Sequence, residues 1–135
     1  MGNNEQLNAY KKTQQSSNAV TSSHEIVRAL MKELVNSMQK IVLDIQDEKR
    51  RKQDQRIVDK AFEEKVALHK SKSFSKCLSI IYGLQTSLDF DKAPDIANSL
   101  FQLYEYCRHE IIKGFSKKIE NGIDKAIDVI KQIME

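Results

Sequence analysis

The hydrophobic residues of this chain recur at alternating spacings of four and three over most of its length. The clearest run follows the polar stretch "TSSHE" and consists of Val27, Met31, Leu34, Met38, Ile41 and Ile45. Such a heptad pattern predicts a long helix whose apolar seam packs against nearly parallel neighbours. Ser22 or Ser23 is suited to cap its first turn, because a hydroxyl oxygen can accept a hydrogen bond from a free backbone amide. The helix is therefore expected to begin here.

Similar runs predict a second helix from about Ile57 to Leu88 and a last helix from about Lys117 to Met134. The second helix repeats the spacing at Cys77, Ile81, Leu84 and Leu88. The last helix repeats it at Ile119, Ile123, Ala126, Ile130 and Ile133. The serines of "SKSFS", residues 71–75, interrupt the pattern and predict a kink or break in the second helix.

A third helix is predicted between these two. The stretch "DFDKAPD" indicates a turn, and Pro94 suits the first position of the helix after it. One apolar stripe consists of Ile96, Leu100, Leu103, Cys107 and Ile111, and the stripe beside it of Ala97, Phe101, Tyr104, Ile112 and Phe115. So wide an apolar arc is expected where a helix touches several others. Gly114 is expected to close the helix as a left-handed C-cap.

Four helical segments with short connections predict an all-α fold, an antiparallel four-helix bundle. Only one proline and four glycines occur in 135 residues, which agrees with long helices. Residues 21–135 are expected to form the single bundle domain. Residues 1–20 are polar and hold too few apolar side chains to become ordered alone, so they are expected to form a flexible N-terminal arm.

Charge and composition exclude several classes of protein. The net charge of +3 comes from 22 basic and 19 acidic residues, so the surface is mixed and no nucleic-acid partner is expected. The charged residues 46–56 are expected to be a solvated connection or helix end. No run is long and apolar enough for a membrane span, and the polar start of the sequence leads us to expect no secretory signal. Cys77 and Cys107 lie far apart on apolar positions, as reduced thiols do in a cytoplasmic protein.

The residues with reactive side chains do not form a catalytic pattern. Cys107 and His109 point about 200° apart around a helix, so they cannot pair within it. The chain has no phosphate-binding loop and no cluster of ligands at metal spacing, so neither an enzyme nor a cofactor is expected. One chemical alternative stays open. "HEIIKG" is similar to the H-x-L-K-G pattern of histidine phosphotransfer domains, with His109 as the phosphorylated residue, although Lys113 falls one position late.

Two stretches resemble a known family. "SLDFDKAPDIANSLFQLYEYCRHEII", residues 87–112, is similar to the segment that enters and forms the third helix in the flagellar secretion chaperone family FliS, including its L-Y-D-Y motif. "NAYKKTQQSSNAVTSSHEIVRALM", residues 8–31, is similar to the N-terminal motif of that family. The chain departs from the family pattern at Ala93 and Pro94, where two glycines are usual, and at Cys107, where methionine is usual. The resemblance covers nearly the whole chain and identifies it as a divergent member.

The resemblance implies a cytoplasmic chaperone that binds the C-terminal helical region of flagellin, prevents premature polymerisation and aids delivery to the export apparatus. A generic helical adaptor remains the other alternative. The expected partner-binding residues are Leu7, Tyr10, Phe101, Tyr104, Tyr106, Arg108 and Ile112. Tyr104 is equally suited to be a core residue. Leu7 and Tyr10 share one face of a helical turn, so the arm is expected to cover part of the binding groove. The protein is expected to be a monomer or a weak homodimer.

Overall fold

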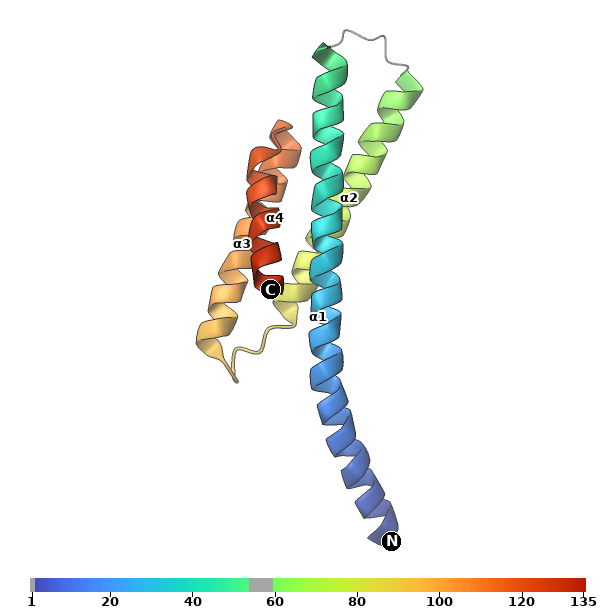
Figure 1. Ribbon diagram of the computed structural model, residues 1–135, viewed down its shortest axis with the longest axis vertical. Helices are drawn as coiled ribbons and strands as arrows, with labels where there is room; N and C mark the ends of the chain where they lie inside the picture. Colours follow the sequence, from blue (N-terminus) through green and yellow to red (C-terminus); the bar gives the residue numbers. More distant parts are fainter. Residues whose placement is uncertain (1, 54–59) are drawn as a thin grey trace.

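The structure, a computed structural model, describes the backbone of residues 2–53 and 60–135 and the side chains of residues 24–53 and 60–135. These residues form four helices and no strand: α1 (Gly2–Gln53), α2 (Lys60–Thr86), α3 (Pro94–Lys117) and α4 (Asn121–Met134). Consecutive helices run in opposite directions, and each packs mainly against the two beside it, so that α4 closes the ring against α1 (Figure 1). The predicted all-α, antiparallel four-helix bundle is confirmed.

The core lies along the seam predicted for α1. Leu34, Met38, Ile41 and Ile45 have 0% of their surface exposed, and Met31 has 5%. The other helices supply the remaining fully buried apolar side chains: Cys77, Ile81 and Leu84 from α2, Tyr104, Cys107 and Ile111 from α3, and Ile123, Ala126 and Ile130 from α4. Each buried leucine or isoleucine contributes about 1.5–3 kcal/mol relative to an exposed one, so this seam is the main source of stability.

Hydrogen bonds between side chains and the backbone stabilise the connection between α2 and α3. At the end of α2, the hydroxyl of Thr86 donates to the carbonyl of Gly83 at 3.1 Å, and that of Ser87 donates to the carbonyl of Leu84 at 2.8 Å. The carboxylate of Asp89 then accepts the backbone N–H groups of Asp91 and Lys92, each at 3.0 Å. α3 begins at Pro94, as predicted. Proline has no backbone N–H, and the N–H of the first helical position would have no partner within the helix, so proline suits this position.

Two expectations about helix continuity are wrong. α1 runs through Ser22 and Ser23, so the helix does not begin there, and its N-terminal part projects beyond the other helices (Figure 1). A serine permits a helix start without requiring one. α2 is unbroken across residues 71–75, where Ser73 is buried against the neighbouring helices. Residue 57, the expected start of the second helix, lies outside the described residues. The division into an arm and a bundle stays a prediction.

Gly114 does not cap α3, contrary to expectation. The helix continues to Lys117, and Lys118 takes the left-handed conformation with φ 56° and ψ 44°, donating its backbone N–H to the carbonyl of Gly114. Gly114 is instead a point of close approach. An added Cβ would lie 2.6 Å from the carbonyl oxygen of Ile119 and 2.6 Å from Cδ1 of Ile123.

The last helix also begins later than expected, at Asn121 rather than Lys117. Ile119 therefore lies in the α3–α4 connection, with 47% of its surface exposed, and is not part of the seam. The rest of the predicted seam holds, since Ile123, Ala126 and Ile130 are fully buried. The expected seam was one turn too long because its spacing continued by chance into the connection.

A nearly buried ion pair joins α1 to α2. The ammonium of Lys70, on a side chain that is 8% exposed, lies 3.0 Å from a carboxylate oxygen of Glu48. It also lies 5.5 Å from the ring centroid of Phe115, which stacks on Phe74 at 4.0 Å. A charge so far from water needs these partners, because an unpaired buried ammonium is costly.

Substitution of Gly114 by alanine is expected to lower the free energy of unfolding by about 1–3 kcal/mol, because the backbone of Ile119 cannot move away from the new methyl group. Gly83, on α2, is the matched control, since an added Cβ there meets nothing within 4 Å. Gly83→Ala should instead stabilise by about 0.5–1 kcal/mol through helix propensity. Urea unfolding of both variants measures the difference, and equal effects would contradict the close approach.

Lys70→Met is expected to destabilise the protein by about 1–3 kcal/mol, because it leaves the partly buried carboxylate of Glu48 without its partner. The matched control is Lys76→Met on the same helix. Lys76 pairs with Glu33 at 2.6 Å, but the two side chains are 52% and 38% exposed. Such a surface pair contributes about 0–1 kcal/mol. If both variants unfold at the same urea concentration, the Lys70 pair has no special role.

Candidate partner-binding surface

α3 carries five of the seven residues expected to bind a partner, and the structure divides them by their position around the helix. The buried stripe of α3 contains Cys107 and Ile111, with 0% exposure. On one flank of this stripe α3 borders α2, and on the other it borders α4. Apolar side chains remain partly accessible on both flanks, so α3 has more apolar surface than the bundle covers.

The flank beside α2 holds Phe101, Arg108 and Ile112. Arg108 and Ile112 follow Phe101 by seven and eleven positions, which places each within about 20° of Phe101 around the axis. Gln85 of α2 crosses to this flank and donates to Glu105 at 2.9 Å and to the carbonyl of Phe101 at 3.5 Å. Phe101 and Ile112 are half-buried, so each keeps apolar surface that a partner can cover.

The charged and aromatic groups on this flank are only loosely tied. The guanidinium of Arg108 lies 3.7 Å from Glu105, and the Arg108 side chain is 49% exposed. Phe90, in the connection before α3, meets the ring of Phe101 edge to face at 6.3 Å and is itself 43% exposed. A solvated ion pair of this kind holds its side chains weakly. Arg108 is therefore free to turn towards an acidic partner group.

Tyr106 lies on the other flank, about 140° around the helix from Phe101. It is 39% exposed and lines a shallow hollow of about 280 Å³ between α3 and α4. The other residues around this hollow are Glu110, Lys113, Gly114, Ile119, Asn121, Gly122 and Lys125. The structure thus does not bring Tyr106 together with Phe101, Arg108 and Ile112.

Tyr104 is a core residue, with 2% of its surface exposed. Burial raises the pKa of its phenol, so the hydroxyl stays protonated. A partner would meet Tyr104 only through its neighbours. The side chains of Leu7 and Tyr10 lie outside the described residues, and their part in binding stays a prediction.

Two exposed apolar side chains near this surface were not expected from the sequence. Ile96 was placed in the buried stripe but is 64% exposed, because α3 extends past its neighbours in its first turn. Phe90 lies in a turn among charged residues. The one signal in the sequence that could have indicated a contact is its large apolar ring among these charges. Both lie at the end of α3 that carries Phe101.

Reactive groups are not arranged for chemistry. Burial raises the pKa of both Cys77 and Cys107 to about 12, so neither thiol forms the nucleophilic thiolate near neutral pH. The Sγ of Cys107 instead lies 3.9 Å from the carbonyl of Ala126. His109 is exposed on α3. Among the described side chains, no three His, Cys, Asp or Glu residues converge as metal ligands do.

None of the helices in the described part of the chain is long and apolar enough to cross a membrane.

Comparison with curated proteins and with solved structures finds no match. A family model does match. Residues 6–135 fit the model described as FliS, flagellar protein FliS, which leaves only the first five residues outside it. The family is one of chaperones in flagellum biogenesis rather than of enzymes, and the match gives no support to phosphotransfer through His109. By this match over nearly its whole length, the chain belongs to the FliS family of flagellar chaperones.

Proposed function

We propose that this protein binds the C-terminal helical segment of flagellin in the cytoplasm, keeps it from polymerising and hands it to the flagellar export apparatus. The family match over residues 6–135 supports a role in flagellar export. The observation that carries the binding role is the apolar surface left on α3 and the connection before it, where Phe90, Ile96 and Tyr106 are 43%, 64% and 39% exposed. Apolar side chains exposed to water are unfavourable, and a bound partner would bury these three.

The physical basis is the burial of an amphipathic helix in a groove between helices. A subunit segment that is disordered before assembly exposes an apolar face, and a chaperone must cover this face to prevent association. Phe101 and Ile112 offer apolar contacts beside α2, and Arg108 offers a charge at their edge. Tyr106 offers a separate contact beside α4. A segment that folds on binding can reach both flanks, because it wraps around the surface instead of docking as a rigid body.

The N-terminal part of α1 is proposed to take part through Leu7 and Tyr10. These residues belong to the segment that projects beyond the other helices (Figure 1). A lone helix of this length is marginal in water without packing, so it gains by docking on the bundle or on the bound partner. We propose a one-to-one complex and a free protein that is monomeric or weakly dimeric.

The first test is isothermal calorimetry with full-length flagellin and with flagellin that lacks its C-terminal helical region. The full-length protein should bind with a negative heat-capacity change, because apolar surface is buried. The truncated protein should bind at least about a hundredfold more weakly, which corresponds to about 2.8 kcal/mol. Equal binding of the two forms would contradict the proposed partner segment.

The second test locates the surface. Phe101→Ala and Tyr106→Ala should each weaken flagellin binding about fivefold to thirtyfold, as expected for aromatic contact residues. Tyr82→Ala is the control, because Tyr82 is 70% exposed on α2 and belongs to neither flank. It should change the affinity by less than about twofold. If Tyr82→Ala weakens binding as much as the α3 variants, the surface lies elsewhere.

Leu7→Ala combined with Tyr10→Ala tests the N-terminal arm and should change the affinity for flagellin or the melting temperature. If both quantities stay unchanged, the arm has no part in binding.

A further inference from the structure

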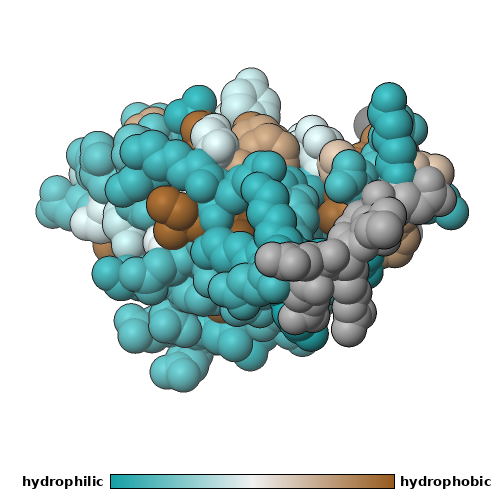
Figure 2. Space-filling model, turned by 90° about the horizontal axis from the view of Figure 1, so that it is seen from above, coloured by the Kyte–Doolittle hydropathy of each residue, from teal (hydrophilic) through white to brown (hydrophobic). Residues whose placement is uncertain are grey.

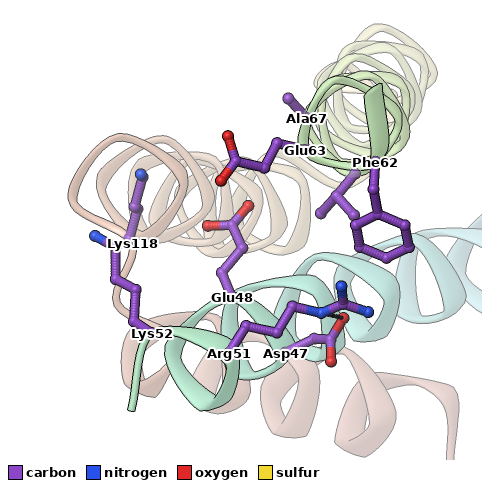
Figure 3. A pocket seen from close by; sticks show the side chains of 9 residues that line it. Asp47, Glu48, Arg51, Lys52, Phe62, Glu63, Ala67 and Lys118 are labelled. Atoms are coloured by element: carbon purple, nitrogen blue, oxygen red, sulfur yellow. Dashed lines mark hydrogen bonds and ion pairs between the residues drawn. The ribbon is translucent and has the colours of Figure 1, made fainter. Parts of the chain in front are cut away.

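A hollow of about 390 Å³ lies between α1 and α2, at the end where the two helices diverge (Figures 1 and 3). The surrounding residues are Asp47, Glu48, Arg51, Lys52, Phe62, Glu63, Val66, Ala67 and Lys118. They come from the last turns of α1, the first turns of α2 and the α3–α4 connection. None of the seven residues expected to bind flagellin is among them, so this hollow is separate from the α3 surface.

Part of the hollow is fixed by internal pairs. The Nε of Arg51 donates to Asp47 at 3.1 Å, and its guanidinium lies 3.8 Å from the ring centroid of Phe62. Glu48 accepts from Lys70, the nearly buried lysine of α2. These contacts hold Phe62 and neutralise both carboxylates before any ligand arrives. The floor formed by half-buried Phe62 and Val66 is therefore preorganised and apolar.

Three charged side chains around the hollow have no ion-pair partner among residues 24–53 and 60–135. Within the described part of the chain, Lys52, Lys118 and Glu63 form no ion pair. In Figure 3, Lys52 and Lys118 lie on the same side of the hollow and Glu63 lies on the other. An anion that enters on the side of the two lysines is attracted by both ammonium groups.

Lys118 occupies this wall at a conformational cost. It is the one residue other than glycine with a positive φ among the described residues, at 56°. Glycine takes this position after a helix more easily, because a Cβ strains the left-handed conformation. The closing hydrogen bonds of α3 use only the backbone of Lys118, so its side chain is not needed for the turn. Its side chain lines the hollow on the same side as Lys52.

The charge pattern selects the kind of anion. A nucleotide or another polyphosphate carries several charges close together, and it would meet the carboxylate of Glu63 across the hollow. A single carboxylate needs only the space between the two lysines. The apolar floor beside them fits a neighbouring apolar side chain. From above, the surface at this end is mostly hydrophilic, with small separate hydrophobic areas (Figure 2). A partner must therefore present acidic and apolar side chains together.

We propose that this hollow is a second partner site, which takes an acidic polypeptide segment. A Glu or Asp side chain lies between Lys52 and Lys118, and an adjacent leucine-like side chain covers Phe62 and Val66. The site leaves the α3 surface free, so it can be occupied while flagellin is bound.

The test uses nuclear magnetic resonance of the ¹⁵N-labelled full chain and does not require flagellin. The probe is a synthetic amphipathic helical peptide with glutamates beside leucines, and the comparison peptide has glutamine in place of each glutamate. The acidic peptide should shift the amides of residues 47–52, 62–67 and 118. The glutamine peptide should bind at least about tenfold more weakly, since it lacks the charge. If both peptides bind alike, or if ATP or inorganic phosphate binds here more tightly than the acidic peptide, the proposal is wrong.

Three variants separate binding from folding. Lys52→Glu with Lys118→Glu should reduce affinity for the acidic peptide at least about tenfold. Lys72→Glu with Lys131→Glu changes the net charge equally at exposed positions away from the hollow, and should change affinity by less than about threefold. Lys118→Gly should raise the melting temperature, because glycine relieves the left-handed strain, and yet weaken binding. A Lys118→Gly variant that binds the acidic peptide as well as the original chain would overturn the proposal.

Discussion

The burial of one seam of α1 against α2 and α4 is the interaction on which the other features of the bundle depend. Leu34, Met38, Ile41 and Ile45 lose all contact with water in this seam. α3 packs mainly against α2 and α4 and lies across the ring from α1. Its buried stripe faces the core, while both flanks stay partly open. The α3 surface proposed for binding stays accessible because α3 has closely packed neighbours on only two sides.

The end of the bundle near Gln53 and Lys60 is held differently. Here the apolar side chains of α2, such as Phe62, are only half-buried. Polar contacts take over: Lys70 pairs with Glu48, and Lys49 reaches Glu120 of the α3–α4 connection at 2.6 Å. An ion pair holds two side chains in a defined orientation. It does not fill the space between helices as the side chains of a close-packed core do. This is why a hollow remains at this end and why its walls are charged.

The seam, the start of α3 at Pro94 and the turn at Asp89 could all be predicted from the sequence, because each follows from spacing or from local backbone chemistry. The expectations that failed depended on tertiary contacts. Gly114 was expected as a cap by the local rule for glycine, yet the approach of Ile123 explains the glycine, and Lys118 takes the left-handed position. The serines of residues 71–75 break no helix, since packing against neighbouring helices outweighs weak local propensity.

The candidate site was also predicted only in part, because its geometry depends on tertiary contacts. Resemblance to the family placed five of the seven expected binding residues on one helix, but a motif does not state how they divide around its axis. The structure puts Tyr106 beside α4 and Phe101, Arg108 and Ile112 towards α2, and it buries Tyr104 in the core. Each flank alone offers little apolar surface, and a small rigid contact would not repay the entropy that is lost on association. A long segment that becomes ordered on binding sums contacts from both flanks, so the divided geometry favours an extended partner over a compact one.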